Sequence, residues 1–169
     1  MIDIPKLHAD ILVIADSFHE FCCHNDIHYF LLGGTALGAA RHQGFIPWDD
    51  DFDVCMDFDN YNKFLELWGL AGLNKEFYLQ RENTEEWPLY FSKLRLNHST
   101  YLEKEDIGRV MHNGVYIDIM CLNKLANQPP VRWFQFVCAK VLTAEALSRR
   151  GYKTPSLLKT IIIFFARLI

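Results

Sequence analysis

The chain has 169 residues, half of them hydrophobic, and a formal net charge of −4. This length suits one domain with its own core, and the apolar content excludes a disordered chain. The acidic balance argues against a protein that holds nucleic acid by neutralising its phosphates, whereas a small nucleotide needs only a local basic pocket.

Five cysteines occur without a CxxC pair, which is typical of reduced thiols in a cytosolic protein. We expect each of them to act as a small buried hydrophobic side chain. The N-terminus has no basic region followed by an apolar run, so a secretory signal is not expected. These features together predict a cytoplasmic protein.

Apolar residues recur at helical spacing over residues 6–24 and predict an amphipathic helix. Residues 27–32 then indicate a short buried strand. Thr35 is expected to cap a short helix over residues 36–41. Acidic and apolar residues alternate over residues 51–56, which is the pattern of a strand with two different faces.

Asp59 is expected to cap a helix over residues 60–71. Further strands are predicted over residues 77–80, 91–96 and 114–122. In the last of these, apolar residues alternate regularly with Asp118 and other larger side chains. Strands and helices interspersed in this way predict an α/β (α+β) fold with a mixed sheet flanked by helices.

Two prolines separate this part from an apolar helix predicted over residues 131–148. A second apolar helix is expected to begin near Thr154-Pro155, since proline favours the first turn. Its apolar stretch, residues 156–169, contains Lys159 and is shorter than the roughly 20 residues that span a bilayer. We therefore expect a domain over residues 1–128 and a buried or interfacial helical extension over residues 129–169.

The acidic strand carries the strongest functional signal. Period two places Asp51 and Asp53 on one face of the predicted strand. Adjacent carboxylates repel each other, and a bound Mg²⁺ or Mn²⁺ offsets this cost, particularly when substrate phosphates complete the coordination. Asp118 is the only acidic residue in its apolar run and is the candidate third ligand. Asp49 is a candidate outer ligand, whereas Asp50 is expected to point away.

A solvated acidic loop is the alternative interpretation, because charge runs usually face water. An unpaired Asp on each of two apolar strands is costly, however, and this favours the metal site. A calcium loop of the EF-hand type fits poorly, since Val54 and Asn60 occupy the places of its glycine and its final glutamate.

Gly33-Gly34-Thr35 follows a predicted strand and opens a helix. Backbone N–H groups at such a junction can hold phosphate oxygens. Two glycines after a strand are often only a turn, but the acidic strand follows within about 20 residues, which favours one shared pocket.

Arg41, Lys93 and Arg95 are the candidate partners of substrate phosphates. Ordinary surface cations are the open alternative for each of them. Trp48 is expected to pack in the core, with stacking on a base or a quaternary ammonium group as the alternative.

The continuous block from Leu31 to Val54 closely resembles the signature of the LicD family, which includes bacterial phosphocholine transferases and is related to fukutin-type phosphotransferases. The resemblance continues at Lys93-Leu94-Arg95 and at Tyr116-Ile117-Asp118-Ile119, and it covers about residues 27–122. It implies a nucleotidyltransferase-like fold, with Asp51 and Asp53 as paired metal ligands and Asp118 as the third carboxylate.

The resemblance also implies transfer of phosphocholine from CDP-choline to a sugar hydroxyl of a lipopolysaccharide or teichoic acid precursor. Members of the family continue further, with a Tyr-Gly-Asp motif that is not found after residue 122 here. The helical extension is therefore expected to be incomplete relative to the family.

Two other functions remain open at this point. A nucleotidyltransferase that moves NMP from an NTP would use the same carboxylates and release pyrophosphate. A non-catalytic chain would bind a nucleotide, or a partner through its apolar C-terminal helices. These helices also suggest peripheral association with the inner face of the membrane, where a glycolipid acceptor would lie.

Overall fold

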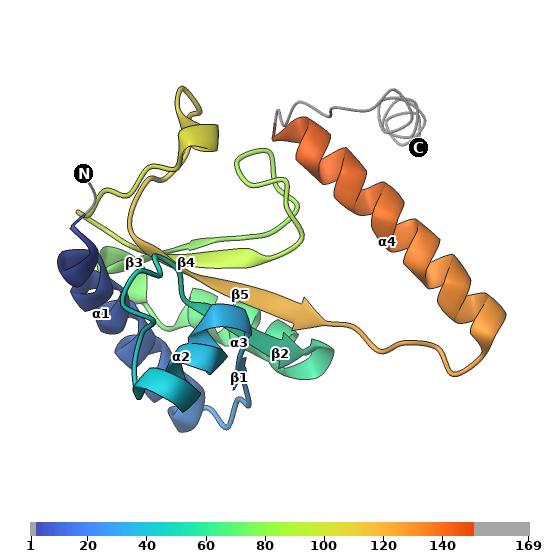
Figure 1. Ribbon diagram of the computed structural model, residues 1–169, viewed down its shortest axis with the longest axis horizontal. Helices are drawn as coiled ribbons and strands as arrows, with labels where there is room; N and C mark the ends of the chain where they lie inside the picture. Colours follow the sequence, from blue (N-terminus) through green and yellow to red (C-terminus); the bar gives the residue numbers. More distant parts are fainter. Residues whose placement is uncertain (1–2, 151–169) are drawn as a thin grey trace.

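The computed structural model describes residues 3–150 (Figure 1). One five-stranded sheet has the order β1-β2-β5-β4-β3, in which β2 and β5 are parallel and all other neighbours are antiparallel. The strands are β1 (Phe30–Leu31), β2 (Asp53–Asp57), β3 (Phe77–Gln80), β4 (Ser92–Leu96) and β5 (Tyr116–Leu122). The helices are α1 (Ile4–His24), α2 (Gly33–His42), α3 (Phe58–Leu70) and α4 (Pro129–Arg149), with two short 3-10 helices, η1 (Leu73–Lys75) and η2 (Lys104–Asp106).

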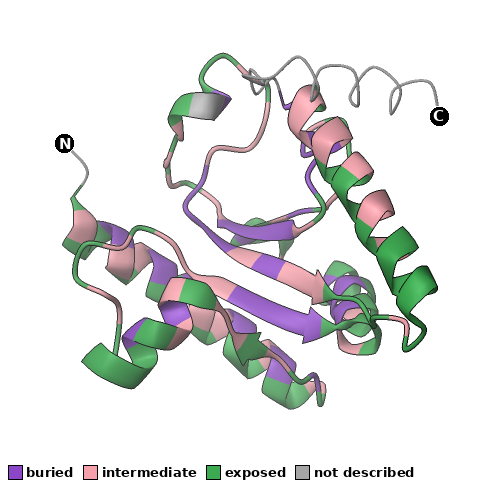
Figure 2. Cartoon of the chain, turned by 45° about the vertical axis from the view of Figure 1, so that its right-hand side comes forward, coloured by how far each residue is buried: buried purple, intermediate pink, exposed green. Residues whose placement is uncertain are grey.

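One face of the sheet is apolar and is covered by α1 and α3. Val54 and Met56 of β2 and Ile117 and Ile119 of β5 point to this side, as the period of two requires. The core formed with the two helices includes Ile11, Ile14 and Phe18 of α1 and Tyr61, Phe64 and Trp68 of α3. The buried stripe along the strands is visible in Figure 2. The predicted mixed sheet flanked by helices is therefore confirmed.

The opposite face of the sheet carries polar and charged side chains. The strand residues that alternate with the core are Asp53, Tyr78, Gln80, Lys93, Arg95, Tyr116 and Asp118. A second, small cluster forms from Trp87, Leu89 and Ala146, with Phe91 and Met111 packed against it. Ala146 belongs to the end of α4, so this cluster attaches the helix to the loop around Trp87.

The rest of α4 extends away from the sheet (Figure 1). Trp133, Phe134 and Phe136 are exposed by 68%, 63% and 59%, so its first turns bury little apolar surface. The predicted second helix near Thr154-Pro155 lies outside the described residues. Within residues 3–150, no helix combines the length and the apolar character that a membrane span requires.

The strand predicted over residues 27–32 is wrong in its length, because only Phe30 and Leu31 pair with β2. The backbone of the preceding residues is used elsewhere. Ile27 N–H donates to Cys22 O at the end of α1, and His28 N–H donates to the side chain of Asn60. These bonds close off α1 and leave two residues for the sheet.

Two predicted helix caps are also wrong. Helix α2 begins at Gly33, so Thr35 lies within its first turn, where the Thr35 hydroxyl accepts a hydrogen bond from Asp53 N–H at 2.8 Å. Helix α3 begins at Phe58, and its cap is Asp57, whose carboxylate accepts from Asn60 N–H at 2.9 Å. Asp59 instead lies in the first turn of α3.

We expect Asp57→Ala to lower the free energy of unfolding by about 1 kcal/mol, because α3 loses the acceptor for one free N–H group. Asp59→Ala is the matched control and should cost only a few tenths of a kcal/mol, since it removes only a favourable interaction with the helix dipole. Urea denaturation of both variants measures the difference. Equal losses would show that Asp57 does not cap the helix.

Candidate active site

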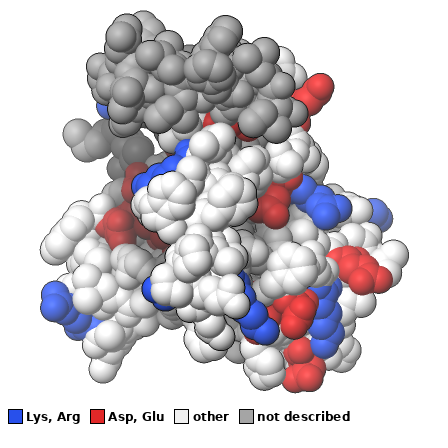
Figure 3. Space-filling model, turned by 90° about the vertical axis from the view of Figure 1, so that its right-hand side faces the viewer, with Lys and Arg blue, Asp and Glu red and all other residues white. Residues whose placement is uncertain are grey.

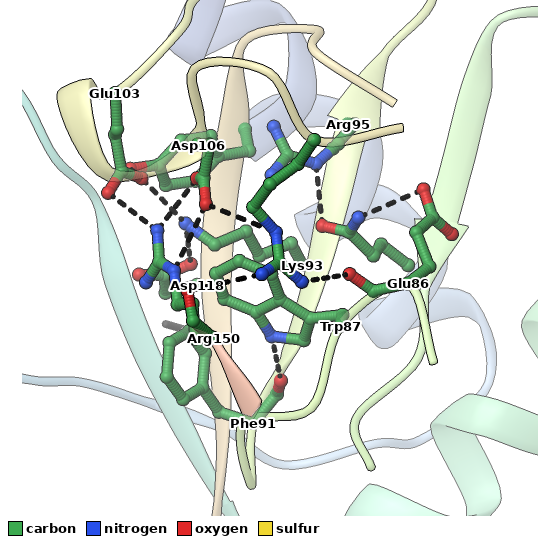
Figure 4. Close-up of polar contacts among 12 residues, drawn as sticks. Glu86, Trp87, Phe91, Lys93, Arg95, Glu103, Asp106, Asp118 and Arg150 are labelled. Carbon is green, nitrogen blue, oxygen red and sulfur yellow. Dashed lines mark hydrogen bonds and ion pairs between the residues drawn. The ribbon is translucent and has the colours of Figure 1, made fainter. Parts of the chain in front are cut away.

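Three charged residues form a row across three neighbouring strands. Asp53 of β2 is the Cα partner of Asp118 of β5, and Asp118 is the partner of Lys93 of β4. All three lie on the polar face of the sheet. Lys93 Nζ lies 3.2 Å from Asp118 Oδ1, and Figure 4 shows these two side chains pointing toward each other. The parallel pairing of β2 and β5 thus joins two carboxylates that are 65 positions apart in the chain.

Asp51 reaches the same region from the loop before β2. The strand begins at Asp53, not at Asp51 as the alternation predicted. The pairing with β5 nevertheless continues one residue further, because Asp118 N–H donates to Phe52 O at 2.9 Å. Burial, followed by the charges of Asp49 and Asp50, raises the pKa of Asp51. Asp51 is therefore close to other carboxylates without being a strand residue.

The two strand carboxylates carry negative charge that the protein only partly neutralises. Burial, then Asp118 and Asp51, raise the pKa of Asp53 to about 6, against the opposing effect of Lys93. Burial also raises the pKa of Asp118 to about 6, although Lys93 lowers it. Asp118 Oδ1 is buried and receives no well-directed hydrogen bond, so the Lys93 ammonium satisfies it only by charge.

The carboxylate oxygens of Asp51, Asp53 and Asp118 suit a divalent cation, which would relieve the repulsion between them. Among residues 3–150, no three His, Cys, Asp or Glu side chains converge closely enough to form a ready-made metal site. A Mg²⁺ or Mn²⁺ ion held by Asp51, Asp53 and Asp118, with Asp49 further out, therefore stays a prediction.

The start of α2 lies directly against the acidic residues. Gly33 has φ +56°, a conformation that favours glycine. A Cβ atom added to Gly34 would lie 2.5 Å from Asp49 Oδ2, and one added to Gly33 would lie 3.4 Å from Asp53 Oδ2. No side chain caps this helix, so its first N–H groups lack a side-chain partner. The positive φ of Gly33 and the close approach of Asp49 to Gly34 thus favour glycine at both positions.

A pocket of about 260 Å³ adjoins this junction. We call residues 49–52, which precede β2, the acidic loop. The lining of the pocket includes Thr35 of α2, Asp49 and Asp51 of the acidic loop, and the aromatic rings of Phe45 and Phe52. Polar groups therefore lie on its wall beside apolar surface, as in many small-molecule sites. Asp50 lies outside the lining and accepts a hydrogen bond from the Tyr101 hydroxyl at 2.7 Å.

The three predicted phosphate partners lie in different environments. Arg41 is exposed in the last turn of α2. Lys93 and Arg95 share one face of β4, as expected, but only 2% and 1% of their surfaces are exposed. The surface-cation alternative is therefore wrong for both. Arg95 donates to Gln80 Oε1 and to Gly114 O, each at 2.8 Å, so its hydrogen bonds are to protein partners.

Burial was predicted for Trp48 and for all five cysteines, and the structure differs at Trp48 and Cys23. Trp48 is 77% exposed and lies beside the ring of His42, so core packing is wrong for it. All five cysteines are free; Cys22 and Cys55 are buried as expected, but Cys23 is exposed. Trp48 thus lies at the surface, directly before the acidic residues that begin at Asp49.

Sequence reasoning missed the residues that surround Lys93. Glu103 accepts from Lys93 Nζ at 3.3 Å and from the Tyr116 hydroxyl at 2.6 Å. Its other carboxylate oxygen lies 3.0 Å from Arg150 Nη2. The Trp87 ring lies 4.7 Å from Lys93 Nζ. Glu103 and Trp87 come from separate loops and Arg150 follows the end of α4, and no motif or spacing links these three. Tyr116 lies on β5, within a stretch that the sequence analysis singled out, but its contact with Glu103 was not predicted.

Acidification is expected to destabilise the fold through Glu103. Burial raises the pKa of this carboxyl, but Lys93, the Tyr116 hydroxyl and Arg150 together lower it to about 2. An unfolded Glu titrates near pH ~4.3, so the stabilisation is complete above that pH and is lost as the pH falls toward 2. Melting temperatures measured from pH 5 downward should fall less steeply in Glu103→Gln. The exposed Glu66→Gln should keep the wild-type slope; the same slope in both variants would contradict the prediction.

Comparison with known proteins agrees with this arrangement. The profile of the family described as LicD/FKTN/FKRP, nucleotidyltransferase domain, matches residues 26–124, more than half of the chain. This range contains α2, the acidic loop and all five strands. The matched region therefore includes every residue of the charged row.

Individual relatives match over shorter stretches. The lipopolysaccharide cholinephosphotransferase LicD of Haemophilus influenzae is 54% identical over 57 residues, which cover 34% of this chain and 22% of that protein. Uncharacterized proteins of Rickettsia prowazekii and Rickettsia typhi are each 56% identical over 36 residues, which cover 21% of this chain and 14% and 12% of those proteins. The chain thus spans less than a quarter of the length of these curated relatives. On the match over residues 26–124, the chain belongs to the LicD family.

Proposed function

We propose that this protein transfers phosphocholine, or a similar phospho-alcohol, from a CDP-linked donor to a sugar hydroxyl of a cell-surface glycan precursor. The proposed acceptor is a lipopolysaccharide or a teichoic acid precursor. The observation that carries the proposal is the row Asp53–Asp118–Lys93 beside the start of α2. A relative named as a lipopolysaccharide cholinephosphotransferase supports the choice of phosphocholine.

In the proposed reaction, the acceptor oxygen attacks the phosphorus atom of the phosphocholine group. A new P–O bond forms, the P–O bond to CMP breaks, and CMP leaves with its phosphate. The proton of the acceptor hydroxyl passes to a carboxylate of the row, and we assign this role to Asp118. Burial raises its pKa to about 6, which suits a group that must take up a proton near neutral pH.

Asp51, Asp53 and Asp118 would hold the divalent cation, with Asp49 as an outer ligand. Such an ion neutralises the negative charge of a diphosphate and of its leaving group. The protein's own part is to hold these carboxylates side by side on β2, on β5 and in the preceding loop. Because the sheet fixes Asp53 and Asp118, these two need little reorganisation during the reaction.

The remaining binding groups surround this row. The N–H groups of Gly34 and Thr35 at the start of α2 are proposed to position the diphosphate, aided by the helix dipole. Lys93, at the β4 end of the row and with its ammonium 3.2 Å from Asp118 Oδ1, would hold the transferred phosphate. Arg95, buried beside it, adds positive charge, and the exposed Arg41 is available to the outer part of the donor.

A donor screen tests the proposal. The protein is incubated with CDP-choline, CDP-ethanolamine and CDP-ribitol, or with NTPs, in the presence of Mg²⁺ or Mn²⁺, and the released product is identified. Release of CMP that depends on an added glycan acceptor supports the proposal. Release of pyrophosphate from an NTP would support the nucleotidyltransferase instead. Calorimetric binding of CDP-choline without turnover would indicate the non-catalytic alternative.

We further infer a cytoplasmic location with α4 on the inner, anionic face of the membrane. Residues 119–144 contain Lys124, Arg132 and Lys140 but no acidic residue, although the chain as a whole is acidic. Trp133 and Phe136 are exposed on the same helix. Figure 3 shows that uncharged surface interrupted by Lys and Arg faces the side where α4 lies. Aromatic rings beside basic residues are typical of an interfacial helix.

Co-sedimentation with vesicles tests this placement. Binding should be stronger to vesicles that contain phosphatidylglycerol than to pure phosphatidylcholine, and it should weaken in Trp133→Ser/Phe136→Ser. Leu70→Ser, which alters a residue that is 78% exposed on α3, is the matched control. Equal binding by the two variants would place the membrane contact elsewhere.

A further inference from the structure

We propose that Glu103 and Arg150 are positioning residues that hold Lys93 against Asp118, so that docking of the end of α4 sets the geometry of the charged row. This inference rests on the proposed function for its catalytic consequence. It adds to that function a residue of α4's end that lies beyond the matched family region, residues 26–124.

A continuous chain of charge contacts connects Arg150 to the candidate active site. Arg150 Nη2 lies 3.0 Å from Glu103 Oε2, and Glu103 Oε1 lies 3.3 Å from Lys93 Nζ. Lys93 Nζ in turn lies 3.2 Å from Asp118 Oδ1. Figure 4 shows the four side chains gathered beside Trp87. Each link alternates in charge, so each group stabilises the next.

Lys93 needs this support because its ammonium group sits on four rotatable bonds. Asp118 alone contacts it from one side. Glu103 adds a second carboxylate, which is itself fixed by the Tyr116 hydroxyl at 2.6 Å. The centroid of the Tyr116 ring lies 3.1 Å from Nζ, and that of the Trp87 ring lies 4.7 Å from it. The ammonium is therefore held between two carboxylates and aromatic faces, and loss of Glu103 would free it to move.

Several contacts also hold the Arg150 side chain in place. Its side chain is 5% exposed, and its guanidinium contacts Asp106 Oδ2 at 2.7 Å as well as Glu103. It also lies over the Trp87 ring at 4.6 Å. Within α4 itself, Ala146 is the buried residue of the described helix. The charges of Arg150 thus link the end of α4 to Glu103 and Asp106, beside the apolar contacts of Ala146.

Arg149 supplies a matched control for the kinetic test. Its guanidinium contacts Asn83 and Thr84, so it also ties the end of α4 to the neighbouring loop. Within residues 3–150, its hydrogen bonds and ion pairs go to residues other than Glu103. Arg150→Ala and Glu103→Gln should each lower kcat for the CDP-linked donor by about 10- to 100-fold, with little change in KM. Arg149→Ala should stay within about 2-fold of wild type, and Arg150→Lys should recover part of the loss, because a charge returns without the bidentate fork.

A second readout does not require turnover. The rate at which N-acetoxysuccinimide acetylates Lys93 is followed by peptide mass spectrometry on the folded chain. Wild type and Arg149→Ala should be protected, whereas Arg150→Ala and Glu103→Gln should react several-fold faster. The labelling still tests the contact chain if no donor is turned over, so failure of this inference is distinguishable from failure of the proposed function.

Two outcomes would overturn the inference. One is equal Lys93 labelling in Arg149→Ala and Arg150→Ala, which would reduce the role of Arg150 to general attachment of the helix. The other is an unchanged labelling rate in Glu103→Gln. If Arg150→Ala does not fold, Glu103→Gln and Arg150→Lys carry the test, because both keep the size of the side chain close to that of wild type.

Discussion

Asp53→Asn is expected to lower turnover of the CDP-linked donor at least about 100-fold while raising the melting temperature by about 2–4 °C. Turnover falls because the row loses one of the carboxylates proposed to hold the cation. Stability rises because Asn keeps the shape of Asp but removes its repulsion with Asp118 and Asp51. Burial and these two neighbours raise the pKa of Asp53 to about 6, so at neutral pH the ionised group destabilises the fold.

The pH dependence gives the sign of this effect. An unfolded Asp titrates near pH ~3.9, and the folded Asp53 binds its proton more tightly. The protonated group therefore contributes stability below about pH 4, and this contribution is lost as the pH rises through 6. In EDTA, the gain in melting temperature from Asp53→Asn should be larger at pH 7.5 than at pH 4. Added Mg²⁺ or Mn²⁺ should stabilise wild type more than the variant.

Asp57→Asn is the matched control. Asp57 lies on the same strand with the same parity, but it is exposed and caps α3, a role that Asn also fills well. The Asp57→Asn variant should turn over the donor at the wild-type rate. If Asp53→Asn turned over the donor as fast as Asp57→Asn, the assignment of the row as the active site would be wrong.

Lys93→Met should lower the free energy of unfolding by about 3–5 kcal/mol and abolish turnover. Lys93 is 2% exposed and neutralises Asp118 and Glu103 in the interior. Methionine fills much of the same volume but leaves the Asp118 carboxylate buried without its cation. Since Glu103 retains Arg150 as a partner, most of the loss is expected to come from Asp118.

The double variant Lys93→Met/Asp118→Asn separates stability from function. Removing both charges should recover most of the lost stability, because no uncompensated charge remains, but turnover should stay absent. Urea denaturation measures the recovery, provided that the dependence of the unfolding free energy on urea concentration is the same in each variant. Lys75→Met, at an exposed lysine of η1, should change the unfolding free energy by less than about 0.5 kcal/mol. Additive losses in the double variant would contradict a direct Lys93–Asp118 interaction.

Much of the fold could be predicted because its signals are local. The strand over residues 77–80 has the predicted bounds, and the apolar helices before and after the sheet are observed within two residues of their predicted starts and ends. Period-two alternation also showed which residues of β5 share a face. The helix caps were less predictable, because Asp57 and Asp59 are equally good cap residues and only the end of β2 decides between them.

The sequence by itself determined which groups are candidates for the site, since the glycines that open α2, the carboxylates before β2 and the strand of Lys93 lie in recognisable local patterns. Only the tertiary structure decided which of these groups meet. The β2–β5 pairing sets Asp53 beside Asp118, and the β4–β5 pairing adds Lys93. Glu103 and Arg150 lie 47 positions apart, and their contact depends on how the loops and α4 close over the sheet. Contacts between such distant residues depend on the fold of the whole chain, so no local sequence pattern could predict them.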